Sequence, residues 1–173
     1  VHLGVETISQ RVMDGIGKHT TLEQVSHALK TFKREGLKVF CYMMLYQAWE
    51  ENGRLCWETP EEVANSLRFC WRSFLRGKIH YMSWQVTTPY PGSRLYDIAQ
   101  RHGVLIKDKA LEEEAGVWDV NMNLPGISEK QIKSDIRKGM LLKDIMALKS
   151  GNISPRAFWR LRRNIRYFIK SIR

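Results

Sequence analysis

The sequence has few cysteines, and their spacing excludes several classes of protein. Only three occur among 173 residues: Cys41, Cys56 and Cys70. Their number is odd and no pair has the Cys-x-x-Cys spacing, so they indicate neither the disulfide framework of a small secreted domain nor a zinc site. We expect buried free thiols in a reducing cytosol.

Long hydrophobic runs are absent as well. No stretch approaches the roughly 18 apolar residues that are needed to cross a bilayer. The first residues lack the basic start and the apolar run of a signal peptide, and they read as a strand without an initiator Met. We therefore expect a cytoplasmic location, and we expect the sequence to be a piece of a longer protein.

Acidic residues are scarce at one end only. Residues 1–128 contain 15 Lys and Arg against 15 Asp and Glu, whereas residues 129–173 contain 13 against 3. The net charge of +10 therefore belongs to the C-terminal part. We interpret 129–173 as a basic helical appendage, and 107–128 as the segment that connects it to the rest.

The rest of the chain repeats one plan three times. Each round is a short apolar run followed by an amphipathic helical stretch: "HLGVET" before "TLEQVSHALKTFKREG", "LKVFCYMML" before "TPEEVANSLRFCWRSFLRG", and "IHYMSWQVTT" before "GSRLYDIAQRHG". Strands that alternate with helices over such links pair in parallel, so the pattern predicts an α/β fold. The middle run is apolar nearly throughout, which predicts a strand covered on both faces.

Local signals predict where the helices start. Thr20 with Glu23, and Thr59 with Glu62, have the spacing of capping boxes, and Pro60 occupies a favoured first helical position. Residues between the second strand and the second long helix are expected to form a loop. The predicted apolar face of that helix consists of Val63, Leu67, Trp71 and Phe74.

In parallel α/β units, ligands bind where strands end and helices begin. Here that rim comprises residues 6–10, 46–58 and 87–93. Glu6 ends the first strand, where a carboxylate can accept hydrogen bonds from ribose hydroxyls or pair with an ammonium group; a salt-bridged glutamate is the alternative. "PYPG" turns the chain sharply, and Gly92 allows close approach of backbone to a ligand; a plain turn is the alternative.

Two rim segments together resemble a known family. "LGVETISQRVMDGIGKHTTLEQV" is similar to the fourth-strand segment of radical S-adenosylmethionine (SAM) enzymes, in the branch that often carries a cobalamin-binding domain. "TTPYPGSRLYDIAQRHGVL" is similar to the sixth-strand motif of that branch. The resemblance covers about residues 1–106. It implies the C-terminal half of an incomplete TIM-like barrel, followed by C-terminal helices, and SAM-dependent radical chemistry such as methyl transfer.

The sequence departs from this family in two respects: the loop after the family's fifth strand is longer here, with Trp49 and Trp57, and the cluster motif is missing. The Cys-x-x-x-Cys-x-x-Cys motif, which ligates a [4Fe-4S] cluster in the family, is absent. The resemblance therefore implies that the cluster ligands lie in a missing N-terminal half of the same protein. It also implies that the present chain is inactive alone, and it leaves the use of cobalamin open.

The resemblance assigns SAM to the rim. Ser9 is equally well an N-cap, and Tyr90 either stacks on an adenine or packs on the helix that follows. The implied cofactor-binding residues are Glu6, Ser9, Gln10, Gln85, Thr87, Thr88, Pro89, Tyr90 and Gly92.

Substrate contacts are expected in the segment after the second strand. Two tryptophans near Glu50, Glu51 and Glu58 can hold an aromatic or cationic small molecule, and a self-packed surface loop is the alternative. The expected substrate-binding residues are Tyr46, Trp49 and Trp57.

The C-terminal segment has an apolar stripe among arginines, formed by Phe158, Leu161, Ile165, Phe168 and Ile172. It is expected to dock on the barrel, to lie on an anionic membrane surface, or to contact nucleic-acid phosphates. Nucleic acid is the least favoured because phosphates need no apolar stripe. Two other functions stay open: a methylthiotransferase-like radical SAM enzyme that modifies RNA, and a non-catalytic α/β binding module.

Overall fold

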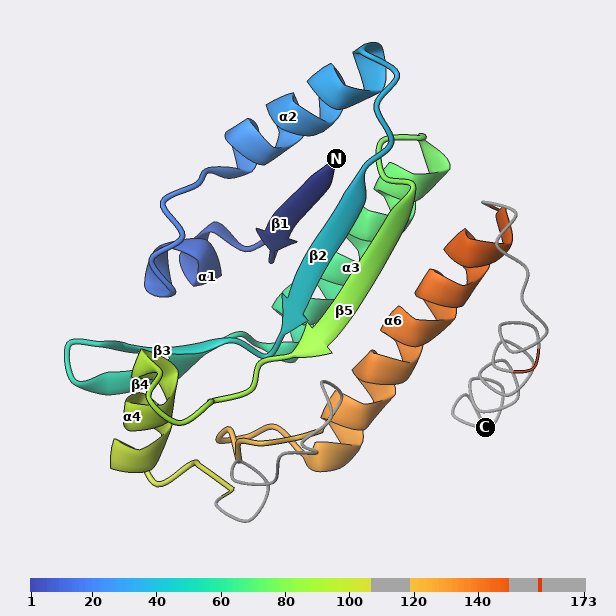
Figure 1. Cartoon of the computed structure of the whole chain (residues 1–173). Coiled ribbons are helices and arrows are strands. Elements are labelled where there is room, and N and C mark those ends of the chain that lie inside the picture. Colours follow the sequence, from blue (N-terminus) through green and yellow to red (C-terminus); the bar gives the residue numbers. More distant parts are fainter. Residues whose placement is uncertain (107–118, 150–158, 160–173) are drawn as a thin grey trace.

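The computed structural model describes residues 1–106, 119–149 and 159, and Figure 1 shows their arrangement. Three parallel strands form a sheet in the order β1 (His2–Glu6), β2 (Phe40–Leu45) and β5 (Tyr81–Val86). The helices are α1 (Gln10–Gly15), α2 (Leu22–Arg34), α3 (Pro60–Leu75), α4 (Arg94–Arg101) and α6 (Glu129–Lys149). The prediction of an α/β fold with parallel strands and a C-terminal helix is confirmed.

The register brings the carboxyl ends of the three strands to one edge of the sheet. Leu45 of β2 pairs with Val86 of β5, and Met43 of β2 pairs with Glu6 of β1. An irregularity in β1 falls between Gly4 and Glu6. The segments that follow the strands therefore start side by side, as the predicted rim requires.

Helix starts follow the predicted signals, with one shift. Thr59 and Glu62 form the capping box of α3, and proline is its first residue. At α2 the box is formed by Thr21 and Gln24, so the prediction of Thr20 with Glu23 is wrong by one residue. The sequence "TTLEQ" contains two overlapping candidate boxes, and only the fold decides between them.

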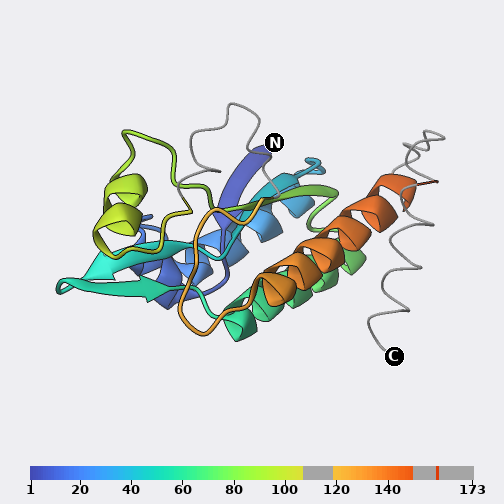
Figure 2. The ribbon, with the colours of Figure 1, turned by 90° about the horizontal axis from the view of Figure 1, so that it is seen from below.

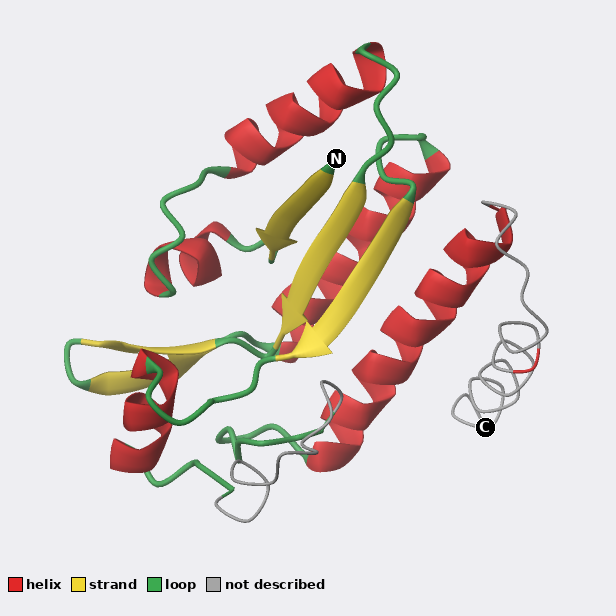
Figure 3. Cartoon of the chain, in the orientation of Figure 1, coloured by secondary structure: helices red, strands yellow, loops and turns green. Residues whose placement is uncertain are grey.

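Residues 46–58, predicted as a loop, contain a β-hairpin. β3 (Ala48–Glu51) pairs antiparallel with β4 (Arg54–Trp57). Asn52 and Gly53 at the tip both have positive φ, 50° and 72°. Asn-Gly is the usual signal for such a two-residue turn, so the sequence did contain the evidence. Figure 3 shows the hairpin beyond the carboxyl ends of β2 and β5, with α4 beside it.

Among the described residues, one face of the sheet is covered and the other is open. On the open face, the rings of His2, Phe40, Tyr42 and Tyr81 pack with centroids 4.8 to 5.7 Å apart. Tyr42 remains 37% exposed, so the prediction that β2 is covered on both faces is wrong for the described part of the chain. The buried residues of the covered face are Val5, Cys41, Met43, Leu45, Met82, Trp84 and Val86.

α6 completes the cover of this face by packing along β5 and α3, as Figure 2 shows from below. Gly139 makes the close approach possible, because a methyl group at this position would lie 3.1 Å from the ring of Trp84. Ile132, Ile136 and Met146 of α6 belong to the same hydrophobic core as the strands. The first part of the basic segment is therefore an integral part of the core.

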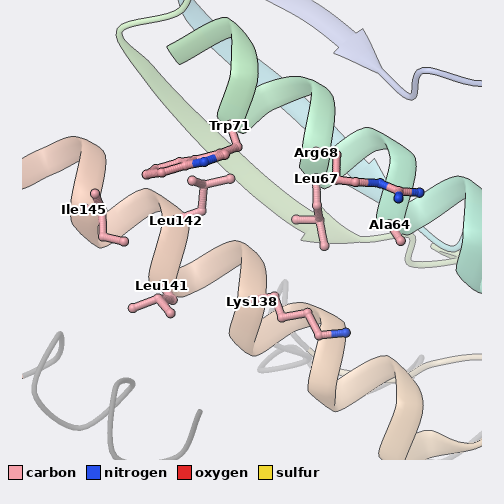
Figure 4. A pocket seen from close by; sticks show the side chains of 8 residues that line it. All are labelled: Ala64, Leu67, Arg68, Trp71, Lys138, Leu141, Leu142 and Ile145. Carbon is pink, nitrogen blue, oxygen red and sulfur yellow. The ribbon is translucent and has the colours of Figure 1, made fainter. Parts of the chain in front are cut away.

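An apolar groove of about 520 Å³ runs between α3 and α6 (Figure 4). Trp71, predicted to be buried, lies exposed at this groove, whereas Val63 and Phe74 are buried as predicted. No helix within 1–106 or 119–149 is long and apolar enough to cross a membrane. The predicted last helix with its apolar stripe at 158–172 lies outside the described residues, so its docking, membrane and nucleic-acid interpretations stay predictions.

Candidate functional site

Two residues at the carboxyl edge of the sheet have strained backbones. Glu6, at the end of β1, has φ of 69°, and Tyr46, directly after β2, has φ of 58°. Residues other than glycine rarely adopt this left-handed conformation, which costs about 1 to 3 kcal/mol each. Strain of this kind concentrates at functional sites, and here it falls on the predicted rim.

The strained backbone of Glu6 places its carboxylate over Gly4 on the open face. A methyl group at Gly4 would lie 2.7 Å from Oε1 of Glu6, so only glycine leaves room for this arrangement. The nearest cation is Lys18, whose Nζ lies 3.8 Å from Oε1. Partial burial raises the pKa of Glu6 above its usual value, and Lys18 offsets part of this rise. The carboxylate is thus half-buried and loosely paired, and it can accept hydrogen bonds from a ligand.

Gln85 lies on the same open face as Glu6. It pairs in the sheet with Met44, and the alternation along β5 puts its side chain opposite that of the buried Trp84. Gln85 is half-buried, so part of this residue is accessible. The structure therefore brings Glu6 and Gln85 to one face and one edge, on the two outer strands.

The turn after β5 is built as its sequence indicates. Pro89 is buried, and the N–H of Ser93 donates to the carbonyl of Tyr90 at 3.0 Å. Gly92 has φ of 82°, which this turn geometry demands of its third residue. Tyr90 is 55% exposed, so it presents aromatic surface that the described residues leave uncovered.

Thr88 is held inside the protein. Its hydroxyl accepts a hydrogen bond from Nδ2 of Asn121 at 3.0 Å and donates to the carbonyl of Val86 at 3.3 Å. It therefore fixes the strand end to the segment before α6. Its O–H is thereby used, so toward a ligand this hydroxyl can act as an acceptor through its second lone pair.

Ser9 and Gln10, predicted to face a ligand, are used internally. Ser9 caps α1 by accepting from the N–H of Val12, and its hydroxyl donates to Glu62 at 2.6 Å. Gln10 accepts from the N–H of Leu22 through Oε1. Its amide nitrogen donates to Asp14 and to the carbonyl of Thr20. The cap interpretation of Ser9 is confirmed, and Gln10 holds the α1–α2 connection.

Glu62 links α3 to α1. Burial alone would raise the pKa of Glu62, but hydrogen bonds from Arg11, Ser9 and Thr59 lower it to about 2. The Arg11 guanidinium lies 2.6 Å from the carboxylate. This ion pair holds α1 against α3.

A second carboxylate at the edge is a structural clamp that the sequence did not reveal. Glu58 is fully buried. It accepts hydrogen bonds from the Thr7 hydroxyl at 2.7 Å and from the N–H groups of Tyr46 and Gln47 at 2.8 and 3.4 Å. Burial raises the pKa of Glu58 to about 7. It joins the ends of β1, β2 and β4, so the idea that it helps to hold a cationic substrate is wrong.

The three predicted substrate residues do not surround one site. The hydroxyl of buried Tyr46 donates to Asp135 of α6 at 2.6 Å. Trp49 is buried against Gly15, with the Arg11 guanidinium 4.9 Å from its ring centroid. Trp57 lines a separate groove beside Arg11 and Cys56. The structure therefore does not bring the three rings together around one site: Tyr46 and Trp49 are buried, and Trp57 lines a groove.

A small cavity at this edge is lined by two of the predicted residues, Trp49 and Thr87. It measures about 220 Å³ and is lined by residues of α1, β3 and α4, together with Thr87 and Trp49. Gln47, which the sequence did not single out, lines it as well. The sequence alone gives no reason to select Gln47. The structure does, because Gln47 directly follows Tyr46, whose backbone is strained.

The titratable side chains of the described residues do not form a metal centre. Within the described ranges, no group of three or more His, Cys, Asp or Glu side chains is placed to hold a metal ion. Cys41 and Cys70 are buried free thiols as predicted, and Cys56 is partly exposed. These residues do not fit an iron–sulfur cluster, because three thiolates do not converge.

Comparison with known proteins gives a distant relative. No family model matches the sequence. The chain is 29% identical over 154 residues to an uncharacterized methyltransferase of Pyrococcus horikoshii, and this alignment includes 84% of the chain but 30% of the relative. The chain thus spans about a third of the length of that protein. Its similarity to a methyltransferase is the relationship that these comparisons support.

Proposed function

We propose that the chain is the C-terminal portion of a SAM-dependent methyltransferase of the radical SAM type, and that its open sheet face forms one wall of the SAM site. The observation that carries this proposal is the Glu6 carboxylate, which a strained backbone holds over Gly4 at the carboxyl edge of the sheet. The radical SAM-like motifs and the similarity to a methyltransferase support it.

Each residue of the wall has a chemical role in this proposal. Glu6 accepts hydrogen bonds from the ribose hydroxyls of SAM or pairs with its ammonium group, displacing Lys18. Gln85 offers an amide donor and acceptor from the other outer strand. The exposed ring of Tyr90 stacks on the adenine, while Gly92 shapes the turn that presents it. These residues bind and orient the cofactor.

A reduced [4Fe-4S] cluster, when bound, would supply the electron that cleaves SAM. The described residues do not provide the ligands of this cluster. What this chain contributes is the position of the nucleoside and of the methionyl group relative to the reacting centre.

Saturation-transfer NMR with SAM and the 173-residue chain tests the proposal, because it detects the weak binding expected of a single wall. We expect Glu6→Gln to weaken SAM binding about tenfold or more, since a charged hydrogen bond contributes about 1.5 to 3 kcal/mol. The matched control is Glu23→Gln, an exposed acid in the first turn of α2. Equal SAM binding by both variants and the parent would refute the role of Glu6.

A further inference from the structure

A groove lined by cationic side chains lies between α2 and α3, on the helix-covered side of the sheet. It measures about 580 Å³, within the roughly 300 to 1,000 Å³ of sites for small molecules. Most of its lining comes from α3, with Ile8, Ser26 of α2 and Lys78 on its other sides. Both helices belong to the same hydrophobic core, so the sheet separates this groove from the open face.

Three arginines form a row along this groove. Arg68 and Arg72 lie within α3 and Arg76 is its C-cap, so they recur at every fourth position on one face of the helix. The row is about 12 Å long, at 1.5 Å per helical residue. All three arginines are exposed, and Lys78 adds a fourth cation to the groove. Like charges at this spacing repel each other, so the row lowers the stability of the fold unless an anion neutralises it.

The fold does not neutralise these four cations with carboxylates of its described residues. Arg68 donates to Oδ1 of Asn65, which is an uncharged group. No ion pair joins the other three cations to an acid within 1–106 or 119–149. Arg11 shows the contrast on the same helix, because it lies 2.6 Å from the carboxylate of Glu62 in the first turn of α3.

The negative end of α3 accounts for only part of this row. Cations stabilise the last turn of a helix, where carbonyl groups lack partners. Lys33 of α2 already serves this end, since its Nζ donates to the carbonyl of Arg76 at 2.8 Å. Arg68 lies about two turns before the end of α3, beyond the range of this effect. The row is therefore longer than the stabilisation of a helix end requires.

Uncharged hydrogen-bonding groups line the same groove. Ser26 contributes a hydroxyl from α2, and Asn65 contributes an amide whose oxygen already accepts from Arg68. The amide nitrogen of Asn65 therefore remains as a donor. Phosphate oxygens are strong acceptors, and a guanidinium can bind two of them through parallel hydrogen bonds. Several guanidinium groups with hydroxyl and amide donors beside them match the needs of a phosphate ligand.

We propose that the groove between α2 and α3 binds a small molecule that carries two or more linked phosphates. A row of about 12 Å exceeds the reach of one phosphate, so the arginines hold successive phosphates of a chain. The bounded volume of the groove favours a small molecule over a nucleic-acid strand, which would continue past both ends. This site lies on the opposite side of the sheet from the SAM wall, and it does not depend on whether SAM binds there.

Isothermal titration calorimetry of the full chain with tripolyphosphate tests the proposal. Tricarballylate, which has three carboxylates, controls for charge and should bind at least about tenfold more weakly, the value of one charged hydrogen bond. Pyrophosphate and ADP separate two sources of the phosphates: tighter binding of ADP identifies a nucleotide, and equal binding identifies the phosphate chain itself. Equal binding of tricarballylate and tripolyphosphate, or binding of oligouridylate without binding of tripolyphosphate, would overturn the proposal.

Variants of equal charge separate this groove from the basic C-terminal segment. The combined variant Arg68→Gln, Arg72→Gln and Arg76→Gln should weaken tripolyphosphate binding at least about a hundredfold, and Arg72→Gln alone about tenfold. Both should keep or raise Tm, because they remove like-charge repulsion. The matched control removes three positive charges elsewhere and should change binding less than about threefold. It combines Arg156→Gln, Arg160→Gln and Arg163→Gln.

The comparison of the two triple variants decides the outcome. Equal losses of binding in both would show that only the net charge of the chain attracts the anion, which would overturn the proposal. A parent chain that does not bind tripolyphosphate at millimolar concentration would overturn it as well.

Discussion

The two faces of the sheet differ: one forms the hydrophobic core, and the other carries the residues proposed to bind SAM. The covered face is uniformly apolar from Val5 to Trp84 and is sealed by helices, including α6. The open face has packed aromatic rings at the amino ends of the strands, but Glu6 and Gln85 at the carboxyl ends. Burial on the covered face stabilises the sheet, and the strained residue Glu6 lies on the other face. The contrast teaches that stability and binding can be altered separately.

Trp84 and Tyr42 test this contrast with the largest expected effect. Trp84→Ala removes a fully buried ring and should lower the free energy of unfolding by about 3 to 5 kcal/mol. Tyr42→Ala, on the open face of the neighbouring strand, should cost about 1 to 2 kcal/mol, the order of its two aromatic pairs with His2 and Phe40. Urea denaturation measures both. Similar losses in the two variants would show that the open face is covered after all.

Glu6 and Glu58 lie at the same edge of the sheet, but only Glu58 is fully buried. The dependence of stability on pH tests the burial of Glu58. The folded-state pKa of Glu58, about 7, lies above its ordinary value of 4.5. The folded protein therefore binds this proton more tightly, and the contribution of Glu58 to stability is full below pH 4.5. It is lost as pH rises to about 7, a change of about 3 kcal/mol.

The measurement for Glu58 is the difference in unfolding free energy between the parent and Glu58→Gln at several pH values. This difference should fall between pH 4.5 and 7 and stay level above. A difference that does not change with pH would contradict the buried carboxyl. Glu23→Gln, at an exposed position, provides the control with a flat profile.

Gly15 tests the packing at the edge with a smaller effect. A methyl group at this position would overlap the ring of Trp49, so Gly15→Ala should force the hairpin to shift and cost about 1 to 3 kcal/mol. Gly17, which follows α1, differs from Gly15: a methyl group there would meet no neighbour, and only its φ of 72° disfavours other residues. An unchanged Tm in Gly15→Ala would show that Trp49 does not pack there.

Gly4 should show the smallest change in stability and still affect binding. An added methyl group would meet only the flexible end of Glu6, 2.7 Å away, and this side chain can swing aside. Gly4→Ala should therefore change the free energy of unfolding by about 0.5 kcal/mol or less. It should weaken SAM binding as Glu6→Gln does, by NMR titration. Normal SAM binding in Gly4→Ala would argue against the placement of this carboxylate.

The sequence predicted what depends on local patterns. The alternation of apolar runs with capped helices predicted the parallel strands, the α3 capping box at Thr59, and the glycine in the turn at Gly92. The hairpin was missed although Asn52-Gly53 is a strong turn signal, because the whole segment between β2 and α3 was predicted to form one loop. Signals of this kind act within a few residues and need no knowledge of the tertiary structure.

Contacts between distant residues were beyond sequence reasoning. Glu58 meets Thr7 across 51 positions, and Tyr46 meets Asp135 across 89. No local pattern marks such pairs, so Tyr46 was read as a ligand contact and the clamp at Glu58 was missed. Gln10 was misjudged for the same reason, since its amide partner Leu22 lies in the next helix.

Methionine methyl groups give the most direct test of the claim that SAM binds the open face. Met44 lies on that face at the carboxyl end of β2, whereas Met43 and Met82 are buried on the covered face. In spectra of the chain with ¹³C-methyl methionine, SAM should shift the Met44 signal and leave those of Met43 and Met82 in place, and Glu6→Gln should suppress the shift. A Met44 signal that stays fixed at saturating SAM, or that shifts equally in Glu6→Gln, would contradict the account.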